Sequence, residues 1–204
     1  MLKAETTGVP VRFQGCGFKN FEQNKGNREL FQECFDFALG KTKKNSLVMF
    51  GRVGTGKTHL SIAVMKNLSP IERETRLRTK FDGEVEEKYA KIITPARSVF
   101  LPVDEFFQEL NDAAVNRESK QKVIDRYLND YDLVVLDDLG IFNWTNAKQE
   151  NLYLFINRAY LDNKRIIITT NFTPEELEQK DERITSRLKE MALFLQFEGK
   201  DYRK

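Results

Sequence analysis

The sequence predicts an α/β protein in which a parallel β-sheet carries helices on both faces. Short apolar runs alternate with helical patterns along the chain, which is typical of such sheets. Residues 133–136 are four consecutive apolar residues, as expected of a central strand that is buried on both sides. A glycine-rich loop also lies between a predicted strand and a predicted helix, the place where these folds bind anions.

Composition narrows the class of protein. The chain has 204 residues, enough for one domain with a sizeable core, and its net charge is +2, so any basic surface must be local. Cys16 and Cys34 do not have the spacing of metal ligands, and His59 is the only histidine, which excludes a histidine-based metal site or catalytic triad. There is no apolar leader and no apolar run of membrane-spanning length, so we expect a cytoplasmic protein without a membrane partner.

The chain divides into two regions. Residues 1–26 contain spaced glycines and aromatic residues, and we expect an irregular segment that packs against the core. Residues 27–204 are expected to form the main domain. It begins with a helix capped by Asn27, whose apolar face recurs at helical spacing and which ends near Gly40.

The phosphate-loop motif follows a predicted buried strand at Ser46–Phe50. Residues 51–58 fit the pattern G-x-x-x-x-G-K-[ST]. Its glycines permit positive φ angles, so that successive N–H groups can cradle phosphates; these residues are Gly51, Gly54, Thr55 and Gly56. Lys57 provides a charge for the β- and γ-phosphates, and the Thr58 hydroxyl is a ligand for Mg²⁺. The sequence therefore predicts binding of a nucleoside triphosphate.

A polar insertion lies between Pro70 and Pro95, spanning about residues 70–95. Four basic residues come first and four acidic residues follow: Arg73, Arg76, Arg78 and Lys80, then Asp82, Glu84, Glu86 and Glu87. We expect a self-neutralising surface excursion, with a DNA-contacting hairpin as the alternative. After it, the sequence predicts a strand at Ser98–Leu101, a helix that begins at Pro102–Asp104, and a charged helix over residues 116–130.

Two carboxylates end the apolar strand at residues 132–138. Open parallel sheets bind their ligands at this edge. We expect Asp137 to hold Mg²⁺, directly or through water, and Asp138 to orient or deprotonate the attacking water. An Asp-rich turn ahead of Gly140 is the alternative, and the phosphate loop in the same chain favours the catalytic interpretation.

The C-terminal third supplies further polar candidates. A helix is predicted over Gln149–Leu161 and a buried strand over Arg165–Asn171. Asn171 either holds the attacking water or is a turn residue. Thr173 and Pro174 begin a helix, Arg183 and Arg187 lie four residues apart on one helical face, and Ala192–Phe197 is a last strand.

Together these motifs resemble the AAA+ ATPases of the DnaC/DnaI helicase-loader group, which includes the IstB transposition helpers and lies close to the initiator DnaA. The matching segments are Phe18–Phe21, Gly51–Leu60, Val134–Gly140, Ile167–Asn171 and Glu182–Leu188. The resemblance implies an AAA+ P-loop core whose five strands, numbered along the chain, lie in the order 5-1-4-3-2. It also implies that no lid domain follows the last strand.

The resemblance assigns roles around the nucleotide. Asn171 corresponds to the sensor-1 residue, between the phosphate loop and Asp137. Phe18 and Asn20 are expected to border the adenine. His59 is expected near the nucleotide, with an ordinary helix-surface residue as the alternative.

The resemblance also implies an arginine finger. Arg187 is the expected finger, reaching the γ-phosphate of a neighbouring subunit, and Arg183 is the second candidate. A surface salt-bridging pair is the alternative for both. An arginine that acts in trans implies self-association through the ATP sites.

The function implied is that of an ATP- and Mg²⁺-dependent ATPase that helps load the replicative DNA helicase onto single-stranded DNA. An IstB-like transposition helper is one alternative, and a nucleotide-gated adaptor with negligible turnover is another. Departures from the family pattern include the long insertion over residues 70–95, and Asp138 where many AAA+ proteins have Glu. The shorter carboxylate favours slow hydrolysis.

Overall fold

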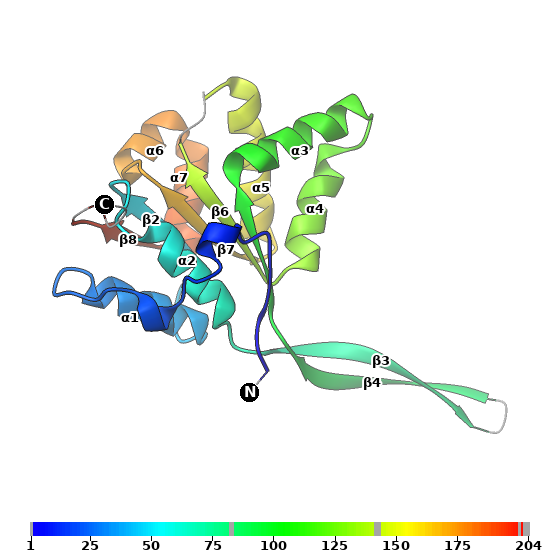
Figure 1. Ribbon diagram of the computed structural model, residues 1–204. Coiled ribbons are helices and arrows are strands. Elements are labelled where there is room, and N and C mark those ends of the chain that lie inside the picture. Colours follow the sequence, from blue (N-terminus) through cyan, green and yellow to red (C-terminus); the bar gives the residue numbers. More distant parts are fainter. Residues whose placement is uncertain (1, 82–83, 141–143, 200, 202–204) are drawn as a thin grey trace.

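Six parallel strands form the central sheet, in the order β1-β5-β6-β7-β2-β8 (Figure 1). The computed structural model describes residues 2–81, 84–140, 144–199 and 201. The strands of this sheet are β1 (Glu5–Thr7), β2 (Ser46–Gly51), β5 (Arg97–Pro102), β6 (Leu133–Leu139), β7 (Arg165–Thr170) and β8 (Ala192–Phe197). The five predicted strands have the predicted order, so the fold class is confirmed.

The sixth strand lies within the segment that was expected to be irregular. β1 pairs in parallel with the edge strand β5, with Glu5 opposite Arg97 and Thr7 opposite Val99. The Glu5 N–H also donates to the Ala96 carbonyl at 2.8 Å. The expectation of an irregular segment was wrong here because three residues carry no periodic pattern. The free edge of β5 supplies the pairing.

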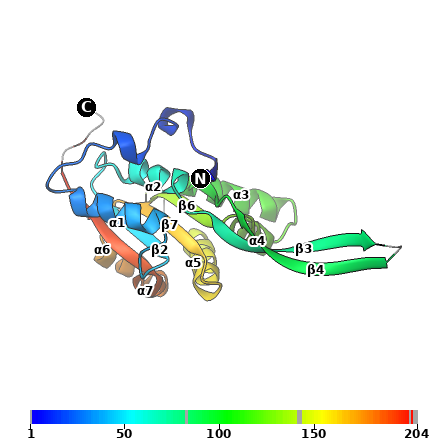
Figure 2. The ribbon, with the colours of Figure 1, turned by 90° about the horizontal axis from the view of Figure 1, so that it is seen from below.

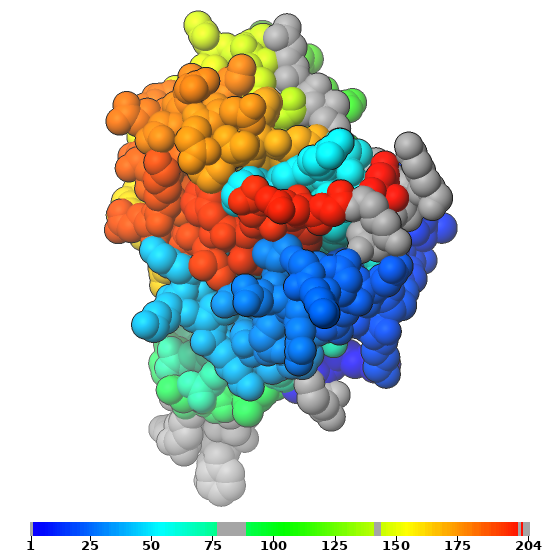
Figure 3. Space-filling view, turned by 90° about the vertical axis from the view of Figure 1, so that its left-hand side faces the viewer, coloured from blue at the N-terminus to red at the C-terminus, as the bar shows by residue number. Residues whose placement is uncertain are grey.

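Helices cover both faces of the sheet (Figures 1 and 2). α1 (Arg28–Ala38) and α2 (Lys57–Lys66) pack on one face, and α1 lies beside β8 at the surface (Figure 3). The other face is covered by α3 (Val103–Val115), α4 (Lys120–Asp130), α5 (Asn146–Leu161), α6 (Pro174–Lys180) and α7 (Glu182–Met191). In β6, Leu133 and Val135 pack in the core on the side of α1 and α2. Val134 and Leu136 pack in the core on the opposite side, under the other five helices. This double burial explains the continuous apolar run in β6.

Two helices begin with the caps that their sequence indicates, whereas the predicted cap of α1 is not formed. Thr173 and Glu176 form a capping box at the start of α6, and Pro174 is its first residue, as predicted. Asp181 accepts the N–H groups of Arg183 and Ile184 at the start of α7. Asn27 precedes α1, but its side chain does not cap the helix, because its carboxamide bonds to Asn24 N and Glu22 O instead.

The insertion forms an antiparallel hairpin that projects from the domain, made of β3 (Ile71–Phe81) and β4 (Glu84–Thr94) (Figure 1). Residues 71–94 contain equal numbers of basic and acidic residues, which supports the self-neutralising interpretation. An ion pair from Arg73 to Asp132 anchors the base of the hairpin, and Asp132 also accepts the Arg97 N–H at 2.7 Å. Contact with DNA remains a prediction.

Within the described part of the chain, no helix is both long enough and apolar enough to cross a membrane.

Candidate nucleotide-binding site

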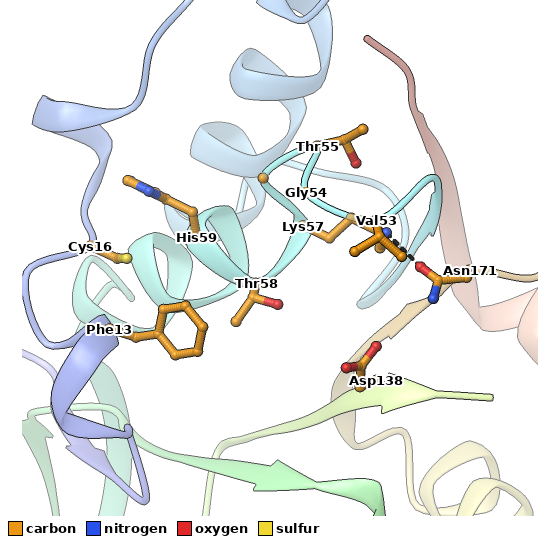
Figure 4. Close-up of a pocket in the computed structure, with 11 residues that line it drawn as sticks. Phe13, Cys16, Val53, Gly54, Thr55, Lys57, Thr58, His59, Asp138 and Asn171 are labelled. Atoms are coloured by element: carbon orange, nitrogen blue, oxygen red, sulfur yellow. Dashed lines mark hydrogen bonds between the residues drawn. The ribbon is translucent and has the colours of Figure 1, made fainter. Parts of the chain in front are cut away.

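The carboxyl ends of β2, β6 and β7 surround a cavity of about 280 Å³ (Figure 4). The phosphate loop forms one wall, and Asp138 and Asn171 lie across from it. The lining residues are Phe13, Cys16, Val53, Gly54, Thr55, Gly56, Lys57, Thr58, His59, Asp138 and Asn171. The structure thus brings together residues that the sequence places in four separate segments.

Three glycines shape the phosphate loop. Gly51, Gly54 and Gly56 have φ angles of 129°, 78° and 97°, so the predicted positive values are confirmed. A Cβ on Gly51 would lie 2.1 Å from the carbonyl oxygen of Phe197 in β8. A Cβ on Gly56 would lie 2.8 Å from the ring of Phe21. The loop therefore needs glycine both for its backbone angles and for close packing.

Lys57 connects the phosphate loop to β7. Its side chain is buried, and Nζ donates to the carbonyls of Gly51 at 2.6 Å and Arg52 at 2.8 Å. Nζ also donates to Asn171 Oδ1 at 3.0 Å, the bond drawn in Figure 4. The cation and the carboxamide are therefore held side by side next to the phosphate loop.

Asp137 lies at the centre of a hydroxyl network. Thr58 Oγ1 donates to its Oδ1 at 3.1 Å, and Thr169 Oγ1 donates to the same oxygen at 2.6 Å. Burial raises the pKa of Asp137, while the Thr169 and Thr58 bonds and the Lys57 charge oppose that change. A hydroxyl and a carboxylate from two adjoining elements are oxygen donors of the kind that Mg²⁺ uses together with phosphates and water. The residues present therefore fit the metal.

Thr169 was not predicted from the sequence. Besides donating to Asp137, its Oγ1 accepts the Asp138 N–H at 2.9 Å, so one hydroxyl positions both carboxylate residues. The sequence signal was a hydroxyl residue inside the apolar strand β7. Its role depends on the register of β7 against β6, which local sequence does not show.

We expect Asp137→Asn to raise the thermal stability of the nucleotide-free protein and to abolish its stabilisation by Mg²⁺ with ATP. The folded-state pKa lies above the ordinary 3.8, so folding favours the protonated carboxyl. Stability from this group is therefore lost as pH rises from 3.8 through the raised pKa. The neutral amide avoids the cost of burying an ionised carboxylate. Each gain of about 1 kcal/mol in the free energy of unfolding corresponds to roughly 2–4 °C in Tm. Thermal unfolding at pH 7.5, with and without MgATP, tests both effects; an unchanged response to MgATP would contradict the metal assignment.

Asp138 has a backbone conformation that few residues adopt. Its φ angle is 66°, and its side chain is exposed and lines the cavity next to Asn171 (Figure 4). Asp is among the residues that tolerate this left-handed region. The kink separates the two carboxylates, with Asp137 buried in the network and Asp138 open to the cavity, where a water molecule can reach it.

His59 lies between the main cavity and a second one of about 210 Å³, and it lines both. Its Nε2 lies 2.9 Å from the carbonyl oxygen of Gly17 and 3.3 Å from the Gly17 nitrogen. The ring of Phe21 packs edge-on against the imidazole at 5.3 Å. His59 thus lies at the site and links α2 to the N-terminal segment.

The N-terminal segment lines the main cavity with residues that were not predicted, and one of its two predicted residues lines the second cavity. Phe18 packs between Phe31 and Phe35 in the core and lines neither cavity, whereas Asn20 lines the second cavity beside Phe21 and Glu22. Two residues of this segment line the main cavity, Phe13 and Cys16, and neither was predicted from the sequence. The only signal for them was their position among spaced aromatic residues and glycines.

Arg183 and Arg187 lie on α7, and neither lines the cavity of its own chain. Arg187 donates to Tyr153 Oη at 3.0 Å and to Asn157 Oδ1 at 2.6 Å. Arg183 forms ion pairs with Asp181 and Glu150, and both guanidinium groups lie over the Tyr153 ring. A finger that acts on a neighbouring subunit remains a prediction.

Comparison with solved structures supports the fold. Domain III of the replication initiation protein DnaA from Thermotoga maritima matches with a TM-score of 0.70 at 21% identity, over 96% of this chain and 70% of that one. The DnaC helicase loader matches with a TM-score of 0.70 at 19% identity, over 93% of this chain and all of that one. At these identities the likeness shows a shared AAA+ fold.

Comparison of sequences gives the family. The chromosomal replication initiator proteins DnaA of Pseudothermotoga lettingae and Mycoplasma genitalium are 26% and 28% identical to this chain, over 90% and 93% of its length. The chain spans only 36% and 40% of those relatives. The family model described as the bacterial DnaA ATPase domain matches residues 79–195, more than half of the chain. The chain therefore belongs to the family of bacterial DnaA ATPase domains.

Proposed function

We propose that this protein binds ATP with Mg²⁺, self-associates through its ATP sites, and helps load the replicative helicase onto single-stranded DNA at the start of replication. The observation that carries the proposal is the joint position of Lys57, Asp137 and Asn171 around the phosphate-loop cavity. Membership of the DnaA ATPase family, together with the fold shared with the DnaC loader, supports the replication role.

In the proposed chemistry, main-chain and side-chain groups of this chain bind the nucleotide and activate the attacking water. The N–H groups of the loop and Lys57 Nζ bind the β- and γ-phosphates. Thr58 and Asp137 would hold Mg²⁺, which would supply positive charge for the phosphate oxygens. Asp138 orients the attacking water and accepts its proton, while Asn171 contacts the γ-phosphate or that water. The exposed position of Asp138 and the bond from Lys57 to Asn171 support these roles.

The proposed DNA partner has support from one relative: the structure titled as replication initiator DnaA bound to AMPPCP and single-stranded DNA has the same fold, with a TM-score of 0.64. A net charge of +2 is too small to attract DNA over the whole surface of the protein, so DNA binding must use a local basic surface. Affinity for single-stranded DNA should therefore fall steeply with added salt. A flat salt response in fluorescence anisotropy would contradict a basic DNA-binding surface.

The helicase-loading role is tested by light scattering coupled to size-exclusion chromatography. The protein is mixed with its host's replicative helicase, with ATP and without it. The expected result is a stable complex that needs ATP and that the Lys57→Ala variant does not form. If no complex forms, while DNA still drives ATP-dependent self-assembly, the proposal fails in favour of a transposition helper of the IstB kind.

We expect Arg187→Ala to lose most turnover while retaining ATP binding, because the guanidinium is proposed to act on the neighbouring subunit. The test is to mix the Arg187→Ala and Lys57→Ala variants, neither of which should hydrolyse ATP alone. An equal mixture should recover about one quarter of wild-type turnover, since random head-to-tail pairing joins the two intact halves at one interface in four.

The control for folding is Arg187→Lys, because Arg187 also bonds to Tyr153 and Asn157. The Arg187→Lys variant should have a Tm closer to that of the wild type than Arg187→Ala has, and its turnover should be low. If the mixture recovers nothing while both variants are folded and self-associate, Arg187 is not a finger in trans, and the same experiment with Arg183→Ala tests the second candidate.

A further inference from the structure

Helix α2 bonds to the N-terminal segment at both of its ends. Residues 13–21 of that segment are named the strap. In the first turn of α2, His59 Nε2 lies within hydrogen-bond distance of the Gly17 main chain. In the last turn, Lys66 Nζ donates to the carbonyl of Cys16 at 2.8 Å and to that of Gln14. The same helix carries Lys57 and Thr58, so one rigid element joins the phosphate loop to the strap.

The strap has little regular structure to hold it in place. One short 3₁₀ turn, Val11–Phe13, leads into it and a second, Phe18–Asn20, lies near its other end, with Gly15 and Gly17 between the two turns. Backbone carbonyls that lie outside helices and strands must find other partners when they are shielded from water. Lys66 is half-buried and supplies a partner to the carbonyl of the half-buried Cys16 and to that of the exposed Gln14. An ammonium group can do this because it has three donors and forms charge-assisted bonds.

The strap also supplies lining residues to both cavities. Phe13 and Cys16 line the main cavity, and Asn20 and Phe21 line the second. Lys66 itself lines neither cavity. Any effect of Lys66 on ligand binding must therefore pass through the strap.

We propose that Lys66 is a positioning residue that holds the strap against the nucleotide site, so that affinity for the nucleoside part of the ligand depends on Lys66 and affinity for the phosphates does not. This inference rests on the proposed function, because it assumes that the cavity takes a nucleotide. It assigns a role to a residue outside the phosphate-loop motif, at the opposite end of the helix that begins at Lys57.

The first test compares affinities for ATP and for inorganic tripolyphosphate, both with Mg²⁺, by calorimetry. Lys66→Met keeps the length of the side chain and removes its donors, whereas Lys66→Arg keeps a donor. The expected result for Lys66→Met is an about tenfold loss of ATP affinity, the size of a lost bond to a charged donor, with unchanged tripolyphosphate affinity. Lys66→Arg should recover most of the ATP affinity.

The matched control is Lys44→Met. Lys44 Nζ also donates to two main-chain carbonyls, those of Lys189 and Glu190. Lys44 precedes β2 at its amino end, whereas the phosphate loop follows the carboxyl end of that strand. This control removes the same chemistry at a distance from the site, and both affinities should stay at the wild-type values.

A second readout needs no nucleotide. The chain has two cysteines; Cys34 is fully buried, so a maleimide labels Cys16 preferentially. Labelling of Cys16, followed by intact-mass spectrometry, should be several-fold faster in Lys66→Met than in the wild type or Lys44→Met. Burial raises the pKa of Cys16 and the Lys66 charge partly opposes that rise, so removing the charge alone would raise the pKa further and slow the reaction. Faster labelling therefore reports displacement of the strap.

The outcomes separate the inference from the proposed function. If Lys66→Met and Lys44→Met have the same ratio of ATP to tripolyphosphate affinity and the same labelling rate, the positioning role is wrong. An equal loss of both ligands, together with a lowered Tm, would also contradict it, because that pattern indicates general destabilisation. If the wild type binds neither ligand, the proposed nucleotide site fails, and the labelling rates alone still decide whether Lys66 holds the strap.

Discussion

Lys57→Ala is expected to weaken ATP binding by about 100-fold, the value for losing one strong bond to a charged group. The ammonium lies among the Gly51 and Arg52 carbonyls and Asn171 Oδ1, where the loop places the phosphates. No other described cationic side chain lines this cavity. Turnover should disappear with binding. Calorimetry with MgATP measures the affinity, and phosphate release measures the turnover.

The control for this prediction is Lys189→Ala. Lys189 is exposed and pairs with Glu178 on the surface of the helical layer, an interaction of the kind that contributes little to stability. Its loss should leave both ATP affinity and turnover unchanged. Wild-type affinity in Lys57→Ala would show that ATP binds outside the phosphate loop, and the proposed site would then be wrong.

Asp138→Asn is expected to retain ATP affinity and to lose turnover by about 100-fold or more, the usual effect of removing a general base. Asn suits this experiment because it tolerates the φ angle of 66° at this position. The main-chain bond from Asp138 N to Thr169 Oγ1 does not involve the side chain and should persist. The variant should therefore bind MgATP and remain in the ATP-bound assembly state.

Two comparisons make the Asp138 result specific. Asp138→Ala should lose stability as well as turnover, because Ala is disfavoured at positive φ. Asp125→Asn changes a carboxylate paired with Arg158 on the helical layer, outside the lining of the cavity, and should leave turnover intact. If the wild type, Asp138→Asn and Lys57→Ala all release phosphate at the same rate, the protein is an adaptor with negligible turnover rather than an ATPase.

Much of the site could be predicted because its chemistry lies in short contiguous stretches. Residues 51–58 contain the glycines, the lysine and the hydroxyl of the phosphate loop in one motif, and their positive φ angles follow from composition. The apolar run that ends in Asp137 indicated a doubly covered central strand, and its acidic end indicated the binding edge. The order of the strands came from the resemblance to AAA+ proteins, since periodicity alone does not give it.

The tertiary structure alone decided the contacts between segments that are distant in the chain. Thr169 reaches Asp137 because of the register between β6 and β7, and β1 exists because the edge of β5 was free. Phe18 is buried by α1, whereas Phe13 faces the cavity, although both look alike as aromatic residues in a glycine-rich segment.

The sequence by itself therefore determined the phosphate loop, the acidic strand end and the α/β class, because each depends on local spacing and on the periodicity of apolar residues. Only the tertiary structure decided which side chains complete the site and what holds them there. Bonds such as those from Lys66 to the Gln14 and Cys16 carbonyls join segments that are about 50 residues apart, and no local pattern encodes them.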